Sequence, residues 1–153
     1  MKAHVLTVSD RVSAGAREDA SGPIAVQELT GFGFTVTNSA VPDDADAIIG
    51  ALRSAIATGV DLALTTGGTG LGPRDVTPEA TLAVIDRSAP GLAELVRRTG
   101  GVPTAALSRG VAGAAGATLI VNLAGSPGAV RDGIEALGPV LLHAIEQLQG
   151  ADH

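Results

Sequence analysis

Cysteine is absent from this sequence of 153 residues, and aromatic side chains are nearly absent. Without cysteine, the chain can form no disulfide, no thiolate nucleophile and no cysteine-rich zinc site. Phe32 and Phe34 are the only aromatic residues, so alanine, valine, leucine and isoleucine have to build the core. The three histidines, His4, His143 and His153, lack the spacing typical of metal ligands.

An excess of positive charge is also missing, because the formal net charge at pH 7 is −6. A nucleic-acid-binding surface needs a basic face, and the sequence shows none, so we expect no nucleic-acid partner. Long apolar runs are absent too, since no stretch reaches the roughly 20 residues that span a membrane. The strand-like run after Met1 is too short for a signal peptide. We therefore expect a cytoplasmic protein without membrane contact.

The chain is rich in apolar residues (45%) and contains 21 glycines, with no internal repeat and no linker. A chain of this length buries roughly 70% of its unfolded surface, so we expect residues 1–153 to form a single domain. The many glycines indicate tight turns and close backbone approaches. An acidic protein of this kind can still bind an anion locally, through backbone amides, a few arginines or a metal ion.

Strand-like and helix-like segments alternate along the chain. The expected strands are 4–8, 34–37, 60–64 and 118–121, and the expected helices are about 23–30, from 42–44 to 59, from 77 onward, from 90 onward, and two final helices carrying 130–137 and 141–148. This alternation is typical of an α/β fold whose mostly parallel central sheet is covered by helices on both faces. The Gly/Ala-rich segment 110–117 is expected to be a loop or a close-packed segment.

A glycine-rich loop, residues 66–75, directly follows the expected strand 60–64. Open α/β sheets bind ligands beyond the carboxyl ends of their strands, which is where this loop falls. Its glycines at 67, 68, 70 and 72 allow successive backbone N–H groups to face one anion. The loop is not a P-loop, because the lysine and the following Ser/Thr are missing, and its glycine spacing is not that of a dinucleotide fingerprint.

Two charged residues end this loop. Arg74 is suited to a bidentate phosphate contact. Asp75 cannot favour a phosphate by charge, so its presence indicates a bridging Mg²⁺ ion, which usually takes one or two carboxylates plus phosphate oxygens. The alternative is an ordinary tight turn in which Arg74 and Asp75 pair in solvent.

Asp43 and Asp44 lie just before the second expected helix. One of them is expected to be the helix N-cap, which typically stabilises a helix by about 1 kcal/mol. The other interpretation makes Asp43 a second carboxylate of the site. The residues alone favour the cap.

A second turn, Ala124 to Gly128, follows the strand 118–121 and nearly matches the nucleophile elbow of serine hydrolases. In that elbow the residue after the serine donates its N–H to the oxyanion. Here this residue is Pro127, which has no N–H, so we reject a serine hydrolase. Asn122 and Ser126 are expected to hydrogen-bond a ligand or to stabilise the turn.

Two further polar segments are ambiguous. Ser9-Asp10-Arg11 ends the first strand and is either the rim of the same cleft or a capped loop. Ser108-Arg109 is either a ligand contact or a surface turn.

The motifs 65–70 and 74–81 together resemble the signature of the molybdenum cofactor biosynthesis family, and in particular its molybdopterin adenylyltransferases and their B-type paralogues. Further similar segments follow in family order: Ser9-Asp10-Arg11, Val41-Pro42-Asp43-Asp44, Pro90-Gly91-Leu92, Leu107-Ser108-Arg109-Gly110 and Asn122 to Pro127. The resemblance covers essentially the whole chain. One departure is Ala124, where the family commonly has proline.

The resemblance implies a three-layer α/β/α fold, usually a homotrimer, and adenylyl transfer. In such enzymes the terminal phosphate of molybdopterin attacks the α-phosphate of ATP, with Mg²⁺ present, and the adenylated product is used for molybdate insertion. Asp43 and Asp75 match the two functional aspartates of the family. The implied partners are therefore molybdopterin and ATP, with a transient contact to the molybdenum insertase.

Together, the residue chemistry and the resemblance predict one site. Asp43 and Asp75 are its catalytic and metal-binding residues, and the predicted ligand-binding residues are Ser9, Thr66, Gly67, Gly68, Thr69, Gly70, Arg74, Ser108, Asn122, Gly125 and Ser126. The main alternative is a non-catalytic B-type paralogue that binds molybdopterin or a nucleotide. A third interpretation, a sugar-phosphate or nucleotide hydrolase, offers no water-activating base beyond the same aspartates.

Overall fold

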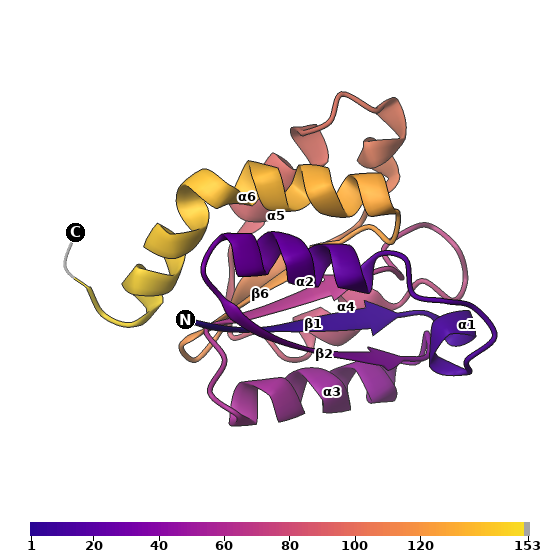
Figure 1. Ribbon diagram of the computed structural model, residues 1–153, viewed down its shortest axis with the longest axis horizontal. Helices are drawn as coiled ribbons and strands as arrows, with labels where there is room; N and C mark the ends of the chain where they lie inside the picture. Colours follow the sequence, from indigo (N-terminus) through magenta and orange to yellow (C-terminus); the bar gives the residue numbers. More distant parts are fainter. Residues whose placement is uncertain (152–153) are drawn as a thin grey trace.

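A six-stranded sheet forms the centre of the molecule (Figure 1), of which the computed structural model describes residues 1–151. The strands are β1 (Lys2–Val8), β2 (Thr35–Val41), β3 (Leu62–Thr66), β4 (Arg87–Ser88), β5 (Ala112–Ala115) and β6 (Thr118–Leu123). Their order across the sheet is β2-β1-β3-β6-β5-β4. The first four strands in this order run parallel to one another, which confirms the predicted α/β fold. His153 lies outside the described residues.

Helices cover both faces of this sheet. They are α1 (Asp10–Ser13), α2 (Gly22–Gly31), α3 (Ala45–Ala57), α4 (Thr77–Leu82), α5 (Pro90–Arg98), the 3₁₀ helix η1 (Pro103–Leu107) and α6 (Pro127–Leu148). Successive strand residues point to opposite faces, so Val5 packs in the cluster formed with α2, α5 and α6, whereas Leu6 packs in the cluster formed with α3 and α4. The strands β3 and β6 in the middle of the sheet are buried on both sides for this reason, and the layers are α/β/α (Figure 1).

The segment 110–117, expected to be a loop or a close-packed segment, contains the strand β5, and all four residues of β5 are buried. β5 is antiparallel to β6, and β4 extends the sheet by pairing antiparallel to β5. The residues of β5, Ala-Gly-Ala-Ala, have low β-propensity. They form a strand because a hairpin turn at Gly116, which has a φ of 59°, returns the chain along β6.

The C-terminal segment also differs from the expectation, since α6 is one helix of 22 residues and not two. Pro139 lies inside it, where proline removes one backbone hydrogen bond and bends the helix. Figure 1 shows the ribbon of α6 changing direction along its length. The helix continues beyond Pro139. Leu137 before the proline and Leu141 and Ile145 after it are all buried in the same core cluster. Over residues 1–151, no helix is long and apolar enough to cross a membrane.

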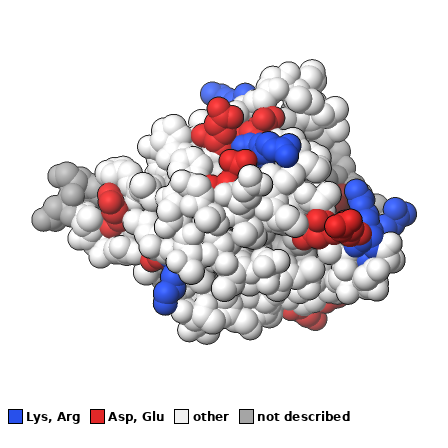
Figure 2. All heavy atoms as spheres, in the orientation of Figure 1, with Lys and Arg blue, Asp and Glu red and all other residues white. Residues whose placement is uncertain are grey.

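The charged side chains gather in small mixed groups on the face seen in Figure 2, with acidic and basic residues next to one another. Four ion pairs are formed among the described residues: Arg74–Asp10, Arg87–Asp86, Arg98–Glu94 and Arg109–Glu79. No continuous basic surface is visible on this face.

Candidate functional site

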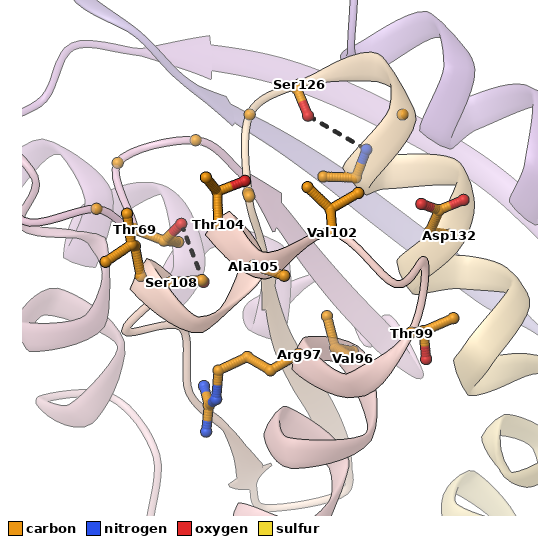
Figure 3. A pocket seen from close by; sticks show the side chains of 18 of the residues that line it. Thr69, Val96, Arg97, Thr99, Val102, Thr104, Ala105, Ser108, Ser126 and Asp132 are labelled. Carbon is orange, nitrogen blue, oxygen red and sulfur yellow. Dashed lines mark hydrogen bonds between the residues drawn. The ribbon is translucent and has the colours of Figure 1, made fainter.

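The two glycine turns predicted from the sequence lie side by side at one edge of the sheet. The first leaves β3 after Thr66 and the second leaves β6 after Leu123, and these two residues are partners in the pairing of the parallel strands. A cavity of about 520 Å³ lies at this edge (Figure 3). Of the predicted site residues, those that line it are Gly67, Gly68, Thr69, Gly70, Asp75, Ser108, Gly125 and Ser126.

Glycine is required at the start of the first turn. Gly67 and Gly68 have φ angles of 93° and 65°, a region that residues with a side chain rarely adopt. A Cβ atom on Gly67 would collide with the carbonyl oxygen of Val8, and one on Gly68 would collide with the Thr77 hydroxyl. A Cβ on Gly125 would lie 3.1 Å from the Cα of Gly67, so glycine also lets the two turns approach each other.

The first turn presents a row of free backbone donors. The N–H groups of Gly68, Thr69, Gly70 and Leu71 have no acceptor within the described part of the chain. Consecutive unpaired N–H groups form a nest that binds an anion. Gly67 does not belong to this row, because its N–H donates to the Leu123 carbonyl at 3.0 Å. The predicted nest from Gly67 to Gly70 is therefore shifted by one residue.

The second turn leads into the N-terminus of α6, which lies at the same cavity. The Ser126 hydroxyl caps this helix by accepting a hydrogen bond from the N–H of Ala129 at 3.2 Å. The N–H groups of Gly125, Ser126 and Gly128 have no acceptor in residues 1–151. The N-terminus of a helix carries a partial positive charge, which favours an anion at this position. Two sets of backbone donors therefore meet at one cavity.

Asp44, and not Asp43, is the N-cap of α3, because its carboxylate accepts a hydrogen bond from the N–H of Ala47 at 2.9 Å. This result separates the two interpretations of the Asp43-Asp44 pair. Asp43 points the other way, since its Oδ2 accepts from the N–H of Asp10 at 2.9 Å. Its Oδ1 lies 3.2 Å from the position of a Cβ on Gly68. Asp43 is therefore next to the nest although it does not line the cavity itself.

Asp75 lies on the other side of the loop and lines the cavity. Its Oδ2 accepts from the N–H of Gly72 at 2.9 Å, and its N–H donates to the Gly72 carbonyl at 3.0 Å. These two bonds close a tight turn over residues 72–75. Asp75 does not pair with Arg74, so the simple solvent-exposed ion pair that the sequence allowed is not formed.

The chemistry of each of the two aspartates suits a metal ion that is shared with a substrate. Each has one carboxylate oxygen bound by a backbone N–H, and the Oδ1 of each has no donor among residues 1–151. The same residues contain no group of three or more His, Asp or Glu side chains that would hold a metal alone. Mg²⁺ takes one or two carboxylates and completes its shell with water and phosphate oxygens, so this donor set suits Mg²⁺ bound together with a phosphate.

Arg74 has a different partner from the predicted phosphate. Its Nε and Nη2 donate to Asp10 Oδ2 and Oδ1 at 2.6 and 2.9 Å, and Nη2 also donates to the carbonyl of Asp43 at 3.2 Å. The hydrogen bond from Arg74 lowers the pKa of the Asp10 carboxyl below its usual value. Because its fork is occupied and it does not line the cavity, Arg74 reaches no ligand in this arrangement. Contact between Arg74 and a phosphate stays a prediction that requires it to leave Asp10.

Three other predicted ligand residues have structural partners. Ser9 caps α1 by accepting from the N–H of Val12 at 3.3 Å. The buried Thr66 hydroxyl bonds to Ser21 at 3.1 Å. Neither residue lines the cavity, and their contact with a ligand stays a prediction.

Asn122, the third of these residues, is 3% exposed and links three elements. Its Nδ2 donates to the hydroxyls of Thr65 and Thr81, both at 2.9 Å, and its Oδ1 accepts from the N–H of Val111 at 3.1 Å. Both hydrogens of its amide nitrogen and one lone pair of its amide oxygen are thereby used. Of the two roles that the sequence allowed, the structure supports the structural one.

Two residues that hold the nest in place were not found from the sequence. Thr77 is the first residue of α4, after Val76 at the cap position, and its hydroxyl donates to the Gly67 carbonyl at 3.0 Å. The N–H of Thr77 donates to the carbonyl of Gly68 at 3.1 Å. Arg109, which the sequence could not assign, bonds to the same loop at Gly70 and Asp75. No pattern near Arg109 in the sequence indicates this, because its partners are 34 to 39 residues away.

The far end of the cavity has a different character. Val96, Val102 and Ala105 line the cavity together with Asp132, which lies on the opposite side of the view from Thr69 and Ser108 (Figure 3). These residues come from α5, from η1 and the residue before it, and from α6. The cavity thus joins a polar end rich in backbone donors to an end with apolar walls.

Comparison of the chain with known proteins points to one family. A family model described as a probable molybdopterin binding domain matches residues 4–143. The molybdenum cofactor biosynthesis bifunctional protein of Synechococcus elongatus is 43% identical over 154 residues, which are 99% of this chain and 48% of that protein. This chain therefore spans about half the length of that relative.

Two further relatives are matched over most of both chains. The molybdopterin adenylyltransferase of Helicobacter pylori strain J99 is 40% identical over 157 residues, covering 95% of this chain and 86% of that protein. The crystal structure of the molybdopterin biosynthesis enzyme MoaB from Thermus thermophilus is 49% identical with a TM-score of 0.92, covering 98% of this chain and 97% of that one. The resemblance inferred from the motifs is thereby confirmed, and the chain belongs to the molybdopterin-binding domain family of molybdenum cofactor biosynthesis proteins.

Proposed function

We propose that this chain transfers AMP from ATP to the terminal phosphate of molybdopterin. The observation that carries the proposal is the pairing of two kinds of group at one cleft. Free backbone donors at Gly68 to Leu71 suit phosphate oxygens, and two carboxylates beside them, Asp43 and Asp75, each have one oxygen free of donors from residues 1–151. A related protein of similar length carries the name molybdopterin adenylyltransferase.

Both reacting groups in this transfer are anions, so the cleft has to offset their repulsion. The nest and the N-terminus of α6 provide backbone N–H groups from two directions, and fixed dipoles of this kind need no reorganisation during the reaction. We assign one phosphate to each set of donors. Holding the two phosphates in a common cleft supplies the proximity and alignment that in-line displacement requires.

Asp43 and Asp75 would hold Mg²⁺ through their free Oδ1 atoms. When bound, the metal ion supplies charge neutralisation on the phosphates of ATP. In the transfer, a phosphate oxygen of molybdopterin forms a bond to the α-phosphorus of ATP, and the bond between the α- and β-phosphates breaks. Pyrophosphate leaves with the electron pair of that bond. A phosphate nucleophile is already ionised near neutral pH, so neither aspartate is assigned a general-base role.

The apolar end of the cavity supports the pterin part of the proposal. Val96, Val102 and Ala105 offer a surface for a flat ring, and Asp132 lies at its edge (Figure 3). A cavity with apolar walls and a few convergent polar groups is the usual form of a small-molecule site.

The second candidate is a B-type protein that binds molybdopterin or a nucleotide without turnover. The 49% identity to MoaB supports a relationship to the B-type branch of the family, whereas the Helicobacter pylori relative carries the name adenylyltransferase. Both candidates use the same nest. They differ in whether the bound phosphates react.

One experiment separates the two candidates. The protein is incubated with molybdopterin and Mg²⁺-ATP, and the products are analysed by mass spectrometry. We expect adenylated molybdopterin and an equal amount of pyrophosphate. Binding of molybdopterin without either product would reject the transferase and leave the binding protein.

A further inference from the structure

Arg109 connects both ends of the loop segment Gly70–Asp75. Its Nε donates to the Gly70 carbonyl and its Nη2 to the Asp75 carbonyl, both at 2.7 Å. The backbone N–H of Arg109 donates to the carbonyl of Thr69, also at 2.7 Å. On its remaining side, Nη1 forms an ion pair with Glu79 of α4. One residue therefore binds three carbonyls of the loop and one carboxylate behind it.

Two of these carbonyls, those of Thr69 and Gly70, determine where two of the free donors of the nest point. A peptide group is planar and trans, so its C=O and N–H point in opposite directions. Fixing the Thr69 carbonyl therefore fixes the direction of the Gly70 N–H, and fixing the Gly70 carbonyl fixes the Leu71 N–H. Both of these N–H groups are free donors of the nest. The bond to the Asp75 carbonyl holds the backbone that carries one of the two candidate metal ligands.

We propose that Arg109 is a positioning residue that sets the phosphate and Mg²⁺ affinity of the cleft through the loop 69–75. Arg109 does not line the cavity, so it acts on the ligand only through the residues that it holds. This inference rests on the proposed function, because it treats the nest and Asp75 as the parts that bind Mg²⁺-ATP. It concerns how those parts are held, which is a separate question from whether transfer occurs.

The arrangement requires arginine. The planar guanidinium presents Nε, Nη1 and Nη2 along three fixed directions, and here each direction has its own acceptor. Lysine has a single nitrogen on a flexible stem and cannot bind both ends of the loop with the same geometry. Glu79 neutralises the charge of Arg109, while the hydrogen bonds to the Gly70 and Asp75 carbonyls come from other guanidinium nitrogens. The ion pair and the hydrogen bonds to the loop can therefore be tested by separate substitutions.

The experiment compares three variants of the whole chain. Arg109→Lys keeps the charge and loses the fork, while Glu79→Gln loses the charge pair and keeps the fork on the loop carbonyls. Arg87→Lys is the matched control, because Arg87 also binds one carboxylate, Asp86, and one carbonyl, that of Gly116 at 2.6 Å. These partners lie at the β5–β6 hairpin, at the opposite end of β6 from the cavity.

Three measurements are made on each variant: the Mg²⁺ dependence of ATP binding, kcat and KM for molybdopterin, and hydrogen exchange of the amides 68–72 in ligand-free protein. Outer contacts to metal-binding groups typically change affinity or activity by about 10- to 100-fold. We expect Arg109→Lys to weaken Mg²⁺-ATP binding and kcat by at least about tenfold, with KM for molybdopterin changed less than about threefold. Exchange at amides 68–72 should accelerate. Glu79→Gln should show a smaller effect, and Arg87→Lys should match the wild type.

A merely structural role gives a different pattern. It predicts a lower melting temperature for Arg109→Lys with unchanged Mg²⁺-ATP affinity and kcat per folded molecule, and that pattern would overturn the proposal. Equal losses in Arg109→Lys and Arg87→Lys would overturn it as well. If the wild-type protein binds Mg²⁺-ATP but transfers no AMP, the proposed function fails, while the binding and exchange measurements still decide the role of Arg109. If the wild type binds no Mg²⁺-ATP, both fail.

Discussion

Asp10 and Asp43 exchange two hydrogen bonds: the N–H of Asp10 donates to Asp43 Oδ2 at 2.9 Å, and the N–H of Asp43 donates to Asp10 Oδ1 at 3.0 Å. Arg74 binds both carboxylate oxygens of Asp10 from the glycine loop. Two carboxylates that repel each other are thus held together by backbone donors and one arginine. The arrangement fixes Asp43 with one oxygen bound and the other beside Gly68.

Replacement of Asp10 by alanine should therefore impair the site more than the fold. Arg74 would lose both hydrogen bonds to the Asp10 carboxylate, and Asp43 would lose the acceptor of its N–H, so the backbone that carries the Asp43 carboxylate would be held less firmly. The N–H of residue 10 would still donate to Asp43 Oδ2. We expect AMP transfer to fall by about tenfold or more, with an increased Mg²⁺ requirement. Asp86→Ala is the matched control, since Asp86 also binds an arginine and a backbone N–H, at Arg87 and Gly116. Equal activities of the two variants would remove Asp10 from any role at the site.

Asp75→Asn tests the metal role directly. The asparagine Oδ1 can still accept the bond from the N–H of Gly72, so the turn over residues 72–75 should persist. The charge is lost, and with it the attraction for Mg²⁺. We expect single-turnover transfer of AMP to fall by about a hundredfold or more, while molybdopterin binding, measured by titration, stays near that of the wild type. A near wild-type rate would show that Asp75 does not hold the metal.

Gly68→Val tests the nest. Valine strongly disfavours the φ of 65° at this position, and its side chain would collide with the Thr77 hydroxyl. The free N–H groups next to it would change direction. Each hydrogen bond to a charged group contributes about 1.5–3 kcal/mol, so we expect the affinity for pyrophosphate or ATP to fall by at least about tenfold. Gly50→Val in α3 is the control, since a Cβ there meets open space. Unchanged affinity in Gly68→Val would contradict the nest.

The sequence predicted the parts of the fold that depend on local pattern. β1, β3 and β6 are short apolar runs, and α2 and α3 follow clear start and stop residues, so their positions were correct within a few residues. β5 was missed because its residues have no strand preference of their own. The pairing with β6, formed after the chain turns at Gly116, makes it a strand.

The site divides in the same way. The glycines of the nest could be predicted, because a turn with positive φ angles, such as those of Gly67 and Gly68, favours glycine and so is visible in the sequence itself. The partner of Arg74 was not, because Asp10 is 64 residues away in the sequence and competes with the phosphate for the same fork. The role of Asn122 was open for the same reason: its partners Thr65 and Thr81 lie 57 and 41 residues away.

Asn122→Ala should reduce stability. The substitution leaves the hydroxyls of Thr65 and Thr81 and the N–H of Val111 without their partner in a buried region. An unsatisfied buried polar group costs about 1–3 kcal/mol, so we expect the free energy of unfolding in urea to fall by at least about that amount. Asn38→Ala, at an exposed position of β2, should change it by less than about 0.5 kcal/mol. A stable Asn122→Ala variant that fails to bind ligand would restore the ligand role.

His4 provides a pH dependence that is separate from the site. Its ring nitrogens lie 2.8 Å from the Thr37 hydroxyl and 2.9 Å from the Ser39 hydroxyl, between β1 and β2. Burial lowers the pKa of His4 below its ordinary value of 6.5. The folded state therefore resists protonation more than the unfolded state does. It follows that the unfolded chain binds more protons in this window, and that stability falls as the pH falls.

We expect the stabilising contribution of neutral His4 to be complete above pH 6.5 and to be lost progressively as the pH falls through its lowered pKa. The test measures the free energy of unfolding from pH 8 to 5 in the wild type and in His4→Gln, whose amide does not titrate. The wild type should lose stability across this range relative to the variant. The carboxyl groups of Asp10, Glu79 and Asp86 also have lowered pKa values, but these act below their ordinary values of 3.8 to 4.5 and so outside the window. Parallel curves for the two proteins would show that protonation of His4 costs the fold nothing.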